Sequence, residues 1–354
     1  MEVKSDSLMN GLLQMGGRNK GRRFSMKRNC FTIIFAVFMA FSVPASAEQA
    51  VEDVLKAVVK IRSIIPKDAH TAKSLGTERE GNGVVIDSKG HILTTGYLIV
   101  EAETIEVFGP EGKKIDATFV GYDHSTGFGL LRTDKLLSVE PMKLGQSSEV
   151  KEGDPVLVAG YGGADSGMRA QVISRKDFAG YWEYILEDAI FTYPPYANFG
   201  GTALIGRDGR LLGIGSLFTQ FMIQGFGSIP CNVFIPIDRL NSILDDLVNT
   251  GRSRQAPRPW LGINAEEAHG RVFVTRVTSG GPAERAGLQP GDLILTVHGK
   301  AVNGLADFYR KVWALGKAGV DVPLSVLQRT QIRDITLHSA DRYQFLMLKP
   351  KKLI

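Results

Sequence analysis

The stretch Gly81-Asn82-Gly83-Val84-Val85-Ile86 runs through the turn Asp87-Ser88-Lys89-Gly90 into His91-Ile92-Leu93-Thr94-Thr95-Gly96-Tyr97. Two apolar runs flank a turn that ends in glycine, which is the pattern of a β-hairpin. Similar short runs separated by turn residues follow as far as Phe234-Ile235. This spacing predicts a mostly β domain, and the apolar runs by themselves fit either a barrel or a sandwich.

Two further segments accompany this hairpin. They are the stretch 122–131, in which Asp123 and Gly127 precede a short apolar strand, and Asn198-Phe199-Gly200-Gly201-Thr202-Ala203-Leu204. Together the three segments resemble the framework of trypsin-like serine proteases of the HtrA (Deg) type. The resemblance extends over roughly residues 50–345 and implies a double β-barrel, in which each segment carries one member of a Ser-His-Asp triad.

The resemblance places the histidine of the triad at Tyr97, the aspartate at Gly127, and the serine at Phe199 or Gly200. A serine nucleophile needs an imidazole to accept its proton, and a phenol with a pKa near ~10 cannot do this at neutral pH. Glycine cannot orient a base, and neither candidate at the serine position offers a nucleophile. We therefore expect a degenerate protease homologue with no intact triad.

The alternative is an active endopeptidase in envelope protein quality control, serine-type or with an unorthodox Thr or Cys nucleophile. Thr202 is the only hydroxyl beside the glycine turn, and Cys231 is predicted in a loop before a strand. A displaced base is needed for either, and the nearby histidines are His91 and His124. His91 follows a turn and opens a strand, and His124 is in the Asp123 turn; both are expected to be exposed polar groups, and Thr202 is expected to be an ordinary strand residue.

A helix is predicted after Pro236, because Leu240, Ile243, Leu244 and Leu247 recur at helical spacing before Gly251. From Trp260 onward the sequence resembles an HtrA-type PDZ domain, an α+β fold. The matching stretches are Trp260-Leu261-Gly262-Ile263 and Gly280-Gly281-Pro282-Ala283-Glu284-Arg285-Ala286-Gly287-Leu288-Gln289-Pro290-Gly291-Asp292-Leu293-Ile294-Leu295.

The PDZ resemblance implies that the backbone amides of Leu261, Gly262 and Ile263 hold a peptide carboxylate, while the peptide adds to a sheet edge. A second helix is predicted after Asn303 as its cap, with Leu305, Phe308, Val312 and Leu315 on one side. Of these we expect Phe308 and Val312 to contact the ligand. Polypeptides with exposed or apolar C-termini are the predicted partners.

The N-terminal residues 1–47 are typical of an extension with a cleavable export signal. Lys27-Arg28 precede the apolar stretch Phe31–Val43, and Ala45-Ser46-Ala47 is a small-residue cleavage site. The apolar stretch is short for a membrane span, so an uncleaved anchor is the minor alternative. The start codon, Met1 or Met26, is left open. We expect a periplasmic or otherwise exported protein.

The charge of the chain comes from this extension. Residues 1–47 hold seven of the 42 basic and two of the 37 acidic side chains, which leaves 35 of each in the remainder. A neutral mature chain argues against nucleic-acid binding. No metal-spaced His or Cys pair and no phosphate-binding glycine loop is present in the sequence, so no metal or cofactor is expected.

The predicted organisation is a trypsin-like domain at 48–250, a linker at 251–258, a PDZ domain at 259–345 and a tail at 346–354. The tail ends in Leu353-Ile354, a pair that a PDZ groove could accept, although a frayed end is the favoured interpretation. The function expected is that of an exported HtrA-like pseudoprotease that binds polypeptides and serves as a scaffold, chaperone-like or regulatory protein. The resemblance also implies a homotrimer or a mixed assembly with active relatives.

Overall fold

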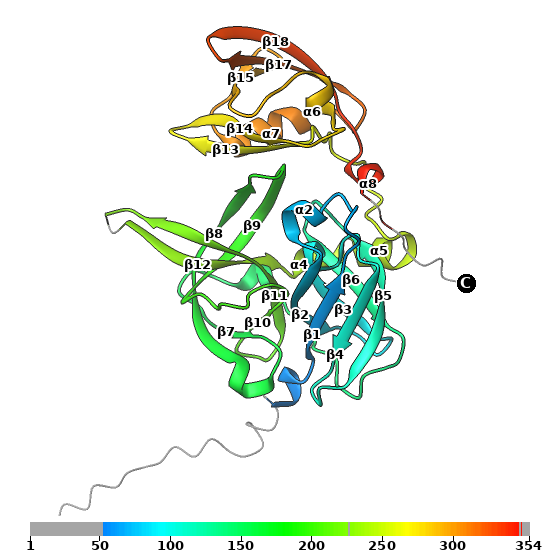
Figure 1. The fold of residues 1–354 in the computed structure, drawn as a ribbon. Helices are drawn as coiled ribbons and strands as arrows, with labels where there is room; N and C mark the ends of the chain where they lie inside the picture. Colours follow the sequence, from blue (N-terminus) through cyan, green and yellow to red (C-terminus); the bar gives the residue numbers. More distant parts are fainter. Residues whose placement is uncertain (1–51, 226, 347, 349–354) are drawn as a thin grey trace, which may run out of the picture. The chain divides into compact units, whose positions relative to one another are not determined.

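The computed structural model describes residues 52–225, 227–346 and 348. The export signal predicted within 1–47 and the terminal pair Leu353-Ile354 lie outside the described residues. The first part of the described chain, residues 58–133, closes into a barrel with the strand order β1-β2-β3-β6-β5-β4 (Figure 1). Its strands are β1 (Val58–Ile64), β2 (Glu78–Val85), β3 (His91–Thr95), β4 (Thr104–Phe108), β5 (Lys114–Tyr122) and β6 (Phe128–Thr133).

The opening hairpin of the sequence forms as predicted. Strands β2 and β3 are antiparallel, with Val84 opposite Leu93 and Val85 opposite Ile92. The short helices of this half are α2 (Ala72–Leu75) and α3 (Gly96–Ile99), and α3 follows β3 directly. Tyr97, in α3, is therefore partly buried against the main apolar core of the domain.

A second closed barrel has the order β10-β11-β12-β9-β8-β7. Its elements are β7 (Pro155–Ala159), β8 (Gly167–Gly180), β9 (Tyr184–Tyr193), β10 (Ala203–Ile205), β11 (Leu211–Ile223) and β12 (Gly227–Pro236), with 3₁₀ turns η1 (Ser147–Glu149) and η2 (Gly163–Ser166). The barrel alternative of the sequence analysis is therefore confirmed over the sandwich. Cys231, predicted in a loop, lies within β12 opposite Thr219 of β11.

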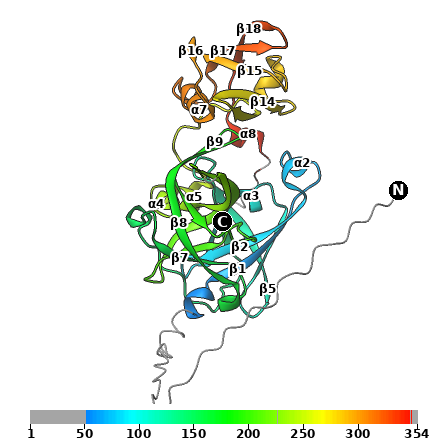
Figure 2. The same cartoon turned by 90° about the vertical axis from the view of Figure 1, so that its left-hand side faces the viewer.

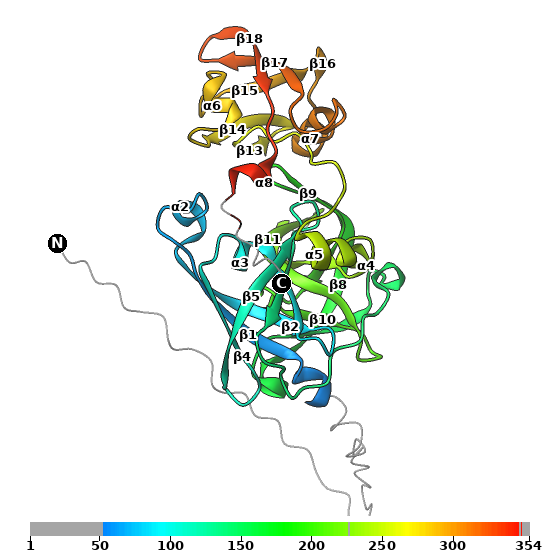
Figure 3. The ribbon, with the colours of Figure 1, turned by 90° about the vertical axis from the view of Figure 1, so that its right-hand side faces the viewer.

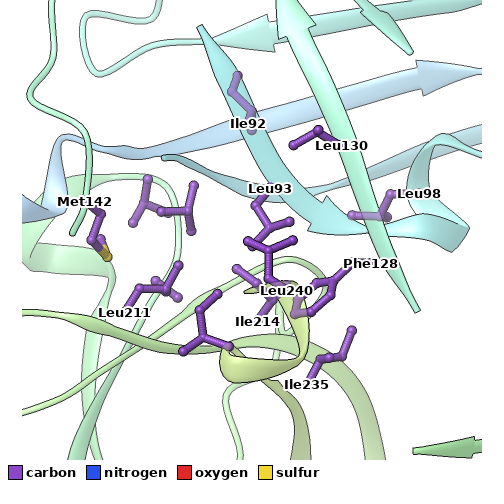
Figure 4. Close-up of a cluster of buried hydrophobic side chains, with 14 of the residues drawn as sticks. Ile92, Leu93, Leu98, Phe128, Leu130, Met142, Leu211, Ile214, Ile235 and Leu240 are labelled. Carbon is purple, nitrogen blue, oxygen red and sulfur yellow. The ribbon is translucent and has the colours of Figure 1, made fainter. Parts of the chain in front are cut away.

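One apolar core joins the two barrels. Figure 4 shows Leu93 and Phe128 from the first barrel beside Ile214 and Ile235 from the second, with Leu240 of α4 (Asp238–Asn241) among them. The helix predicted after Pro236 is divided into α4 and α5 (Leu244–Thr250). Gly251 ends α5 in the left-handed conformation, at φ 76°, as the sequence predicts.

The C-terminal part is a sheet of order β13-β14-β15-β17-β18, with β16 paired to β15 (Figure 2). The strands are β13 (Ile263–Ala268), β14 (Arg271–Val277), β15 (Leu293–Val297), β16 (Lys300–Ala301), β17 (Asp321–Gln328) and β18 (Gln331–His338); the helices are α6 (Pro282–Arg285), α7 (Leu305–Trp313) and α8 (Arg342–Phe345) (Figure 3). Strand β13 is at the end of the sheet, so one of its edges has no strand partner within this sheet. The mostly β class with a following α+β domain is confirmed.

Helix α7 begins one residue later than predicted. Its cap is Gly304, at φ 117°, and the backbone N–H of Asn303 donates to the carboxylate of Asp307 at 2.8 Å. Leu315 lies beyond the end of the helix. The glycine cap removes the expected Asn303 side-chain bond but leaves the apolar face of the helix in register with the core.

Candidate functional site

Tyr97 and Gly200 meet at the centre of the barrel pair. A Cβ added to Gly200 would lie 2.6 Å from the hydroxyl oxygen of Tyr97. The positions assigned to the base and to one of the two serine alternatives are thus neighbours, and the phenol occupies the space of a side chain at 200. Burial raises the pKa of Tyr97 to about 12, so the phenol is neutral at physiological pH.

Arg79 fixes the helix that carries Tyr97. Its guanidinium is buried and donates to the carbonyl oxygens of Tyr97, at 2.7 Å, and Val100, at 3.1 Å, and to the hydroxyl of Thr71 at 2.8 Å. Burial lowers the pKa of Arg79 to about 10, which still leaves it charged near neutrality. The sequence analysis missed this residue. The available signal was the two-residue period of β2, which puts Arg79 on the same face as Gly81 and Gly83.

The aspartate position is filled in a comparable way. A Cβ on Gly127 would lie 2.8 Å from the hydroxyl oxygen of Tyr184, at the start of β9. That hydroxyl donates to the carbonyl oxygen of Thr126 at 2.7 Å. Burial raises the pKa of Tyr184 well above its usual value, so it too remains a neutral donor.

Asn82 holds the glycine turn from the opposite barrel. Its Nδ2 donates to the carbonyl oxygens of Asn198, at 2.9 Å, and Gly200, at 3.0 Å, and its Oδ1 accepts from the N–H of Tyr161 at 2.8 Å. Its own N–H also donates to the carbonyl of Gly200. The side chain of Asn82, which belongs to β2 of the first barrel, therefore links that barrel to segments of the second, a role that nothing local in the sequence indicated.

Gly201 allows this close approach. A Cβ there would lie 1.8 Å from the carbonyl oxygen of Asn82, and its φ is +75°. The N–H of Gly201 donates to the carbonyl of Gly215 at 2.8 Å, so it is engaged in the barrel. Phe199, the other serine alternative, has its ring centroid 6.4 Å from that of Phe218 on β11. These contacts give the turn a structural role in holding β10 against β11.

The two unorthodox nucleophile candidates are both buried. Thr202 donates its hydroxyl to the carbonyl oxygen of Phe199 at 2.8 Å. The thiol of Cys231 is in the barrel core, and burial raises its pKa to about 11. Because the thiolate is the reactive form, such a thiol is a poor nucleophile at neutral pH.

Both histidines expected to be exposed are more enclosed than predicted. His91 is buried, with Nδ1 2.6 Å from a carboxylate oxygen of Asp87. Nδ1 of His124 lies 2.9 Å from the hydroxyl of Tyr122, and Nε2 lies 3.1 Å from both the carbonyl of Glu183 and Nη1 of Arg342. The recorded partners of these rings in the described part of the chain include neither Thr202 nor Cys231.

At the PDZ groove, the three predicted carboxylate-binding amides donate to a carboxylate, that of Glu183 in the β8–β9 loop. The distances are 2.7 Å from the N–H of Leu261 to Oε2, 2.8 Å from Gly262 to Oε1, and 3.0 Å from Ile263 to Oε1. The carboxylate is itself buried. The sequence reasoning did not identify Glu183; its one signal is an acid set among the aromatic residues 181–184.

Phe308 and Val312 belong to the apolar core of this C-terminal domain. Their exposures are 0% and 1%, and Leu305 and Tyr309 are buried on the same helix. Phe308 belongs to the same apolar cluster as Leu261 and Ile263 of the predicted carboxylate-binding loop. Contact with a ligand by Phe308 and Val312 stays a prediction.

Comparison with known proteins identifies the two parts. A trypsin-like peptidase domain model matches residues 81–214, and a PDZ domain model matches 259–338. The chain has a trypsin-like peptidase domain followed by a PDZ domain. A probable periplasmic serine endoprotease, DegP-like, of Pseudomonas putida (strain W619) is 29% identical over 276 residues, which are 73% of this chain and 55% of that protein.

A second relative is the periplasmic pH-dependent serine endoprotease DegQ of Escherichia coli (strain K12), 27% identical over 267 residues, or 70% of this chain and 56% of that protein. The chain therefore spans just over half the length of these curated HtrA-type relatives. A solved structure of a variant of the HtrA-type protease AlgW with a tripeptide has a TM-score of 0.51 and 23% identity. The superposition covers 83% of this chain and 96% of the AlgW chain, and it supports the HtrA-type fold.

Within the described residues no group of three or more His, Cys, Asp or Glu side chains is arranged to hold a metal. Among the helices of the described residues, none is long and apolar enough to cross a membrane. The arrangement gathers the backbone N–H groups of Leu261, Gly262 and Ile263 around one carboxylate, that of Glu183, beside β13 at the end of its sheet.

Proposed function

We propose that this chain is an exported HtrA-like pseudoprotease that binds polypeptides through its PDZ domain and acts as a scaffold, chaperone-like or regulatory protein. The proposal keeps the predicted division into domains at 48–250 and 259–345. Because the chain spans only part of its curated relatives, their activity and assembly state enter as part of this proposal. Export is supported by residues 1–47 and by the periplasmic relatives.

The observation that carries the proposal is the contact between Tyr97 and Gly200. A hydroxyl placed where a nucleophile's side chain would stand excludes a second side chain from that space. A phenol with a pKa of about 12 does not accept a proton at neutral pH, which leaves this position without a general base. With Tyr184 against Gly127, two of the three triad positions are occupied by neutral tyrosines.

The PDZ part supports the binding half of the proposal. Three backbone donors converge on one carboxylate beside β13, the end strand of its sheet, and PDZ domains recognise C-termini with such donors by strand addition. Affinity in this mode comes from main-chain bonds, so it does not require an active protease domain. Apolar C-termini suit the apolar cluster behind the loop.

The names of the curated relatives favour a second candidate, an active endopeptidase, and one experiment separates the two. The purified full chain is incubated with fluorescein-labelled casein and, separately, with a fluorophosphonate probe that labels activated serine and threonine. E. coli DegQ is the positive control, and Thr202→Val and Cys231→Ala are the matched variants. We expect no cleavage and no labelling above a heat-denatured sample. Cleavage that is lost in either variant would establish an unorthodox protease and refute the pseudoprotease proposal.

A further inference from the structure

The loop between β8 and β9 lies in the PDZ groove in the manner of a bound peptide. Glu183 presents its carboxylate to the amides of Leu261, Gly262 and Ile263. We propose that this loop is a built-in competitor for the groove, with Glu183 standing in for the C-terminal carboxylate of a polypeptide ligand. The inference rests on the proposed function in that it requires a groove that binds peptides.

A main-chain bond to β13 supports this assignment. Two residues before Glu183, the carbonyl oxygen of Tyr181 accepts from the N–H of Ala265 at 2.8 Å, and Ala265 is two residues after Ile263 on β13. This bond lies along the strand that an added peptide would pair with, although residues 181–183 themselves form a turn. The loop therefore uses a main-chain group of β13 as well as the three amides that bind the carboxylate.

Helix α7 provides the second wall of the groove. The hydroxyl of Tyr309 donates to the carbonyl of Gly180 at 3.1 Å and accepts from the N–H of Glu183 at 3.2 Å. Tyr309 is 1% exposed, so these bonds are shielded from water. Arg310, one residue further on, pairs with Asp177 of β8. The loop therefore touches both elements between which a PDZ ligand lies.

Ile185 indicates which ligand would displace the loop. Although it belongs to β9, it is buried in the apolar cluster of the PDZ domain together with Leu261, Ile263 and Phe308. A competitor must replace the carboxylate and this apolar side chain together. The ligand class is an extended polypeptide with a free C-terminal carboxylate and an apolar side chain close to it.

Undocking of the loop is physically plausible because the docked carboxylate is desolvated. Burial raises the pKa of Glu183, against the three amide bonds that lower it. A solvated Glu183 regains water contacts that a docked one lacks, which favours undocking. The loop belongs to the same chain as the groove, so its effective concentration there is high, which favours docking. Docking is thus a balance that a free peptide at sufficient concentration can shift.

The test compares the full chain with Glu183→Gln, which keeps the size of the side chain but places an amide NH₂ among three N–H donors. Glu187→Gln is the matched control, because Glu187 lies four residues further along, on β9, and pairs with Arg239 instead. The probe is a fluorescein-labelled decapeptide ending in Leu-Ile with a free carboxylate, and its C-terminal amide is the negative control. We expect Glu183→Gln to bind the probe about tenfold more tightly, and Glu187→Gln to match the wild type.

Hydrogen exchange at Leu261–Ala265 gives a readout that needs no ligand. We expect the amides of Leu261, Gly262 and Ile263 to exchange about tenfold faster in Glu183→Gln than in the wild type, because their carboxylate acceptor is lost, and the amide of Ala265 to follow if the loop undocks. If Glu183→Gln fails to fold, Tyr309→Phe removes two contacts of the loop with no change in shape, and about threefold tighter binding is expected.

The outcomes separate the two proposals. Equal Kd values in wild type and Glu183→Gln refute the competitor whatever the exchange shows. No binding of the free-carboxylate probe to either protein, with exchange accelerated in Glu183→Gln, refutes the peptide-binding function itself. Equal binding of the amidated probe refutes recognition of a C-terminal carboxylate.

Discussion

The centre of the barrel pair and the PDZ groove are both filled by residues of this chain, but in different ways. At the barrel centre, the hydroxyls of Tyr97 and Tyr184 occupy the space beside Gly200 and Gly127, positions that the proposed function assigns to a lost triad. In the groove, every backbone donor at Leu261–Ile263 is retained, and hydrogen bonds to Glu183 engage them.

Under the proposed function, this difference separates a permanent change from a reversible one. Catalysis depends on the identity of a few side chains, so the substitutions proposed at the triad positions would remove it at the level of the sequence. Strand addition depends on backbone groups that every residue carries, so substitutions would leave that capacity in place. Occupation of the groove by another segment is a reversible way to control it.

The largest effect is expected for Gly201→Ala, which tests how tightly the barrel centre is packed. The new Cβ would lie 1.8 Å from the backbone carbonyl of Asn82, and φ of +75° disfavours a side chain. We expect the free energy of unfolding in urea to fall by at least about 4 kcal/mol, or folding to fail.

Gly200→Ala is the matched control for that measurement. Its Cβ would meet the hydroxyl end of the Tyr97 side chain, which can shift more easily than a backbone carbonyl. A loss of about 1 kcal/mol is expected. Comparable losses in the two alanine variants would contradict the assignment of the closest backbone approach to Gly201.

Asn82→Ala is expected to have the next largest effect. The variant leaves the carbonyls of Asn198 and Gly200 and the N–H of Tyr161 without their side-chain partner. Loss of such buried bonds typically costs about 2 to 4 kcal/mol in total, measured by urea unfolding. Asn241→Ala, at an exposed position, is the control and should change stability by less than about 0.5 kcal/mol. A loss in Asn82→Ala as small as in the control would show that the turn is held by its backbone alone.

The sequence predicted what is encoded locally. The β2–β3 hairpin follows from alternating apolar residues around a glycine turn, and the end of α5 follows from Gly251. The extension of the β11–β12 pair to Ile223 and Gly227 was missed. Along that extension Phe218 and Met222 are exposed, so the usual contrast between polar and apolar faces, which signals a strand, is weak there.

The contacts that define the candidate sites join residues far apart in the chain. Glu183 meets Leu261 across 78 positions, and His124 meets Arg342 across 218. No local pattern records such a pair, and polar residues such as His124 were therefore assigned to solvent. The resemblance predicted which three backbone amides bind a carboxylate, but it did not predict that Glu183 of the same chain supplies that carboxylate.

A smaller effect is expected from His124, which lies beneath the tip of the β8–β9 loop. Burial, reinforced by the positive charge of Arg342, lowers the pKa of His124 well below its usual value. The unfolded chain then binds more protons than the folded one below about pH 6.5, so stability falls as the pH is lowered through that range. We expect a slope of up to about 1.4 kcal/mol per pH unit between pH 6.5 and pH 5 in urea unfolding.

His124→Gln should remove most of that pH dependence, since Gln does not titrate. His269→Asn, at an exposed site with φ of 53°, should leave the slope unchanged. The groups that face the ring of His124 are the hydroxyl of Tyr122, the guanidinium of Arg342 and the carbonyl of Glu183. If the free energy of unfolding has the same slope against pH in the wild type and in His124→Gln, the proton taken up on unfolding binds to a group other than His124.

The smallest effect is expected for Arg310→Ala, which tests whether a surface ion pair helps to hold the β8–β9 loop in the groove. The Arg310–Asp177 pair is about half exposed at both ends, at 53% and 42%, and such pairs contribute about 0 to 1 kcal/mol. The Kd for the Leu-Ile probe should stay within about threefold of the wild-type value. A change in Kd as large as that of Glu183→Gln would mean that the surface ion pair holds the loop, and 0.5 M NaCl should then release it. If the buried bonds of Glu183 hold the loop, the Kd should depend little on salt.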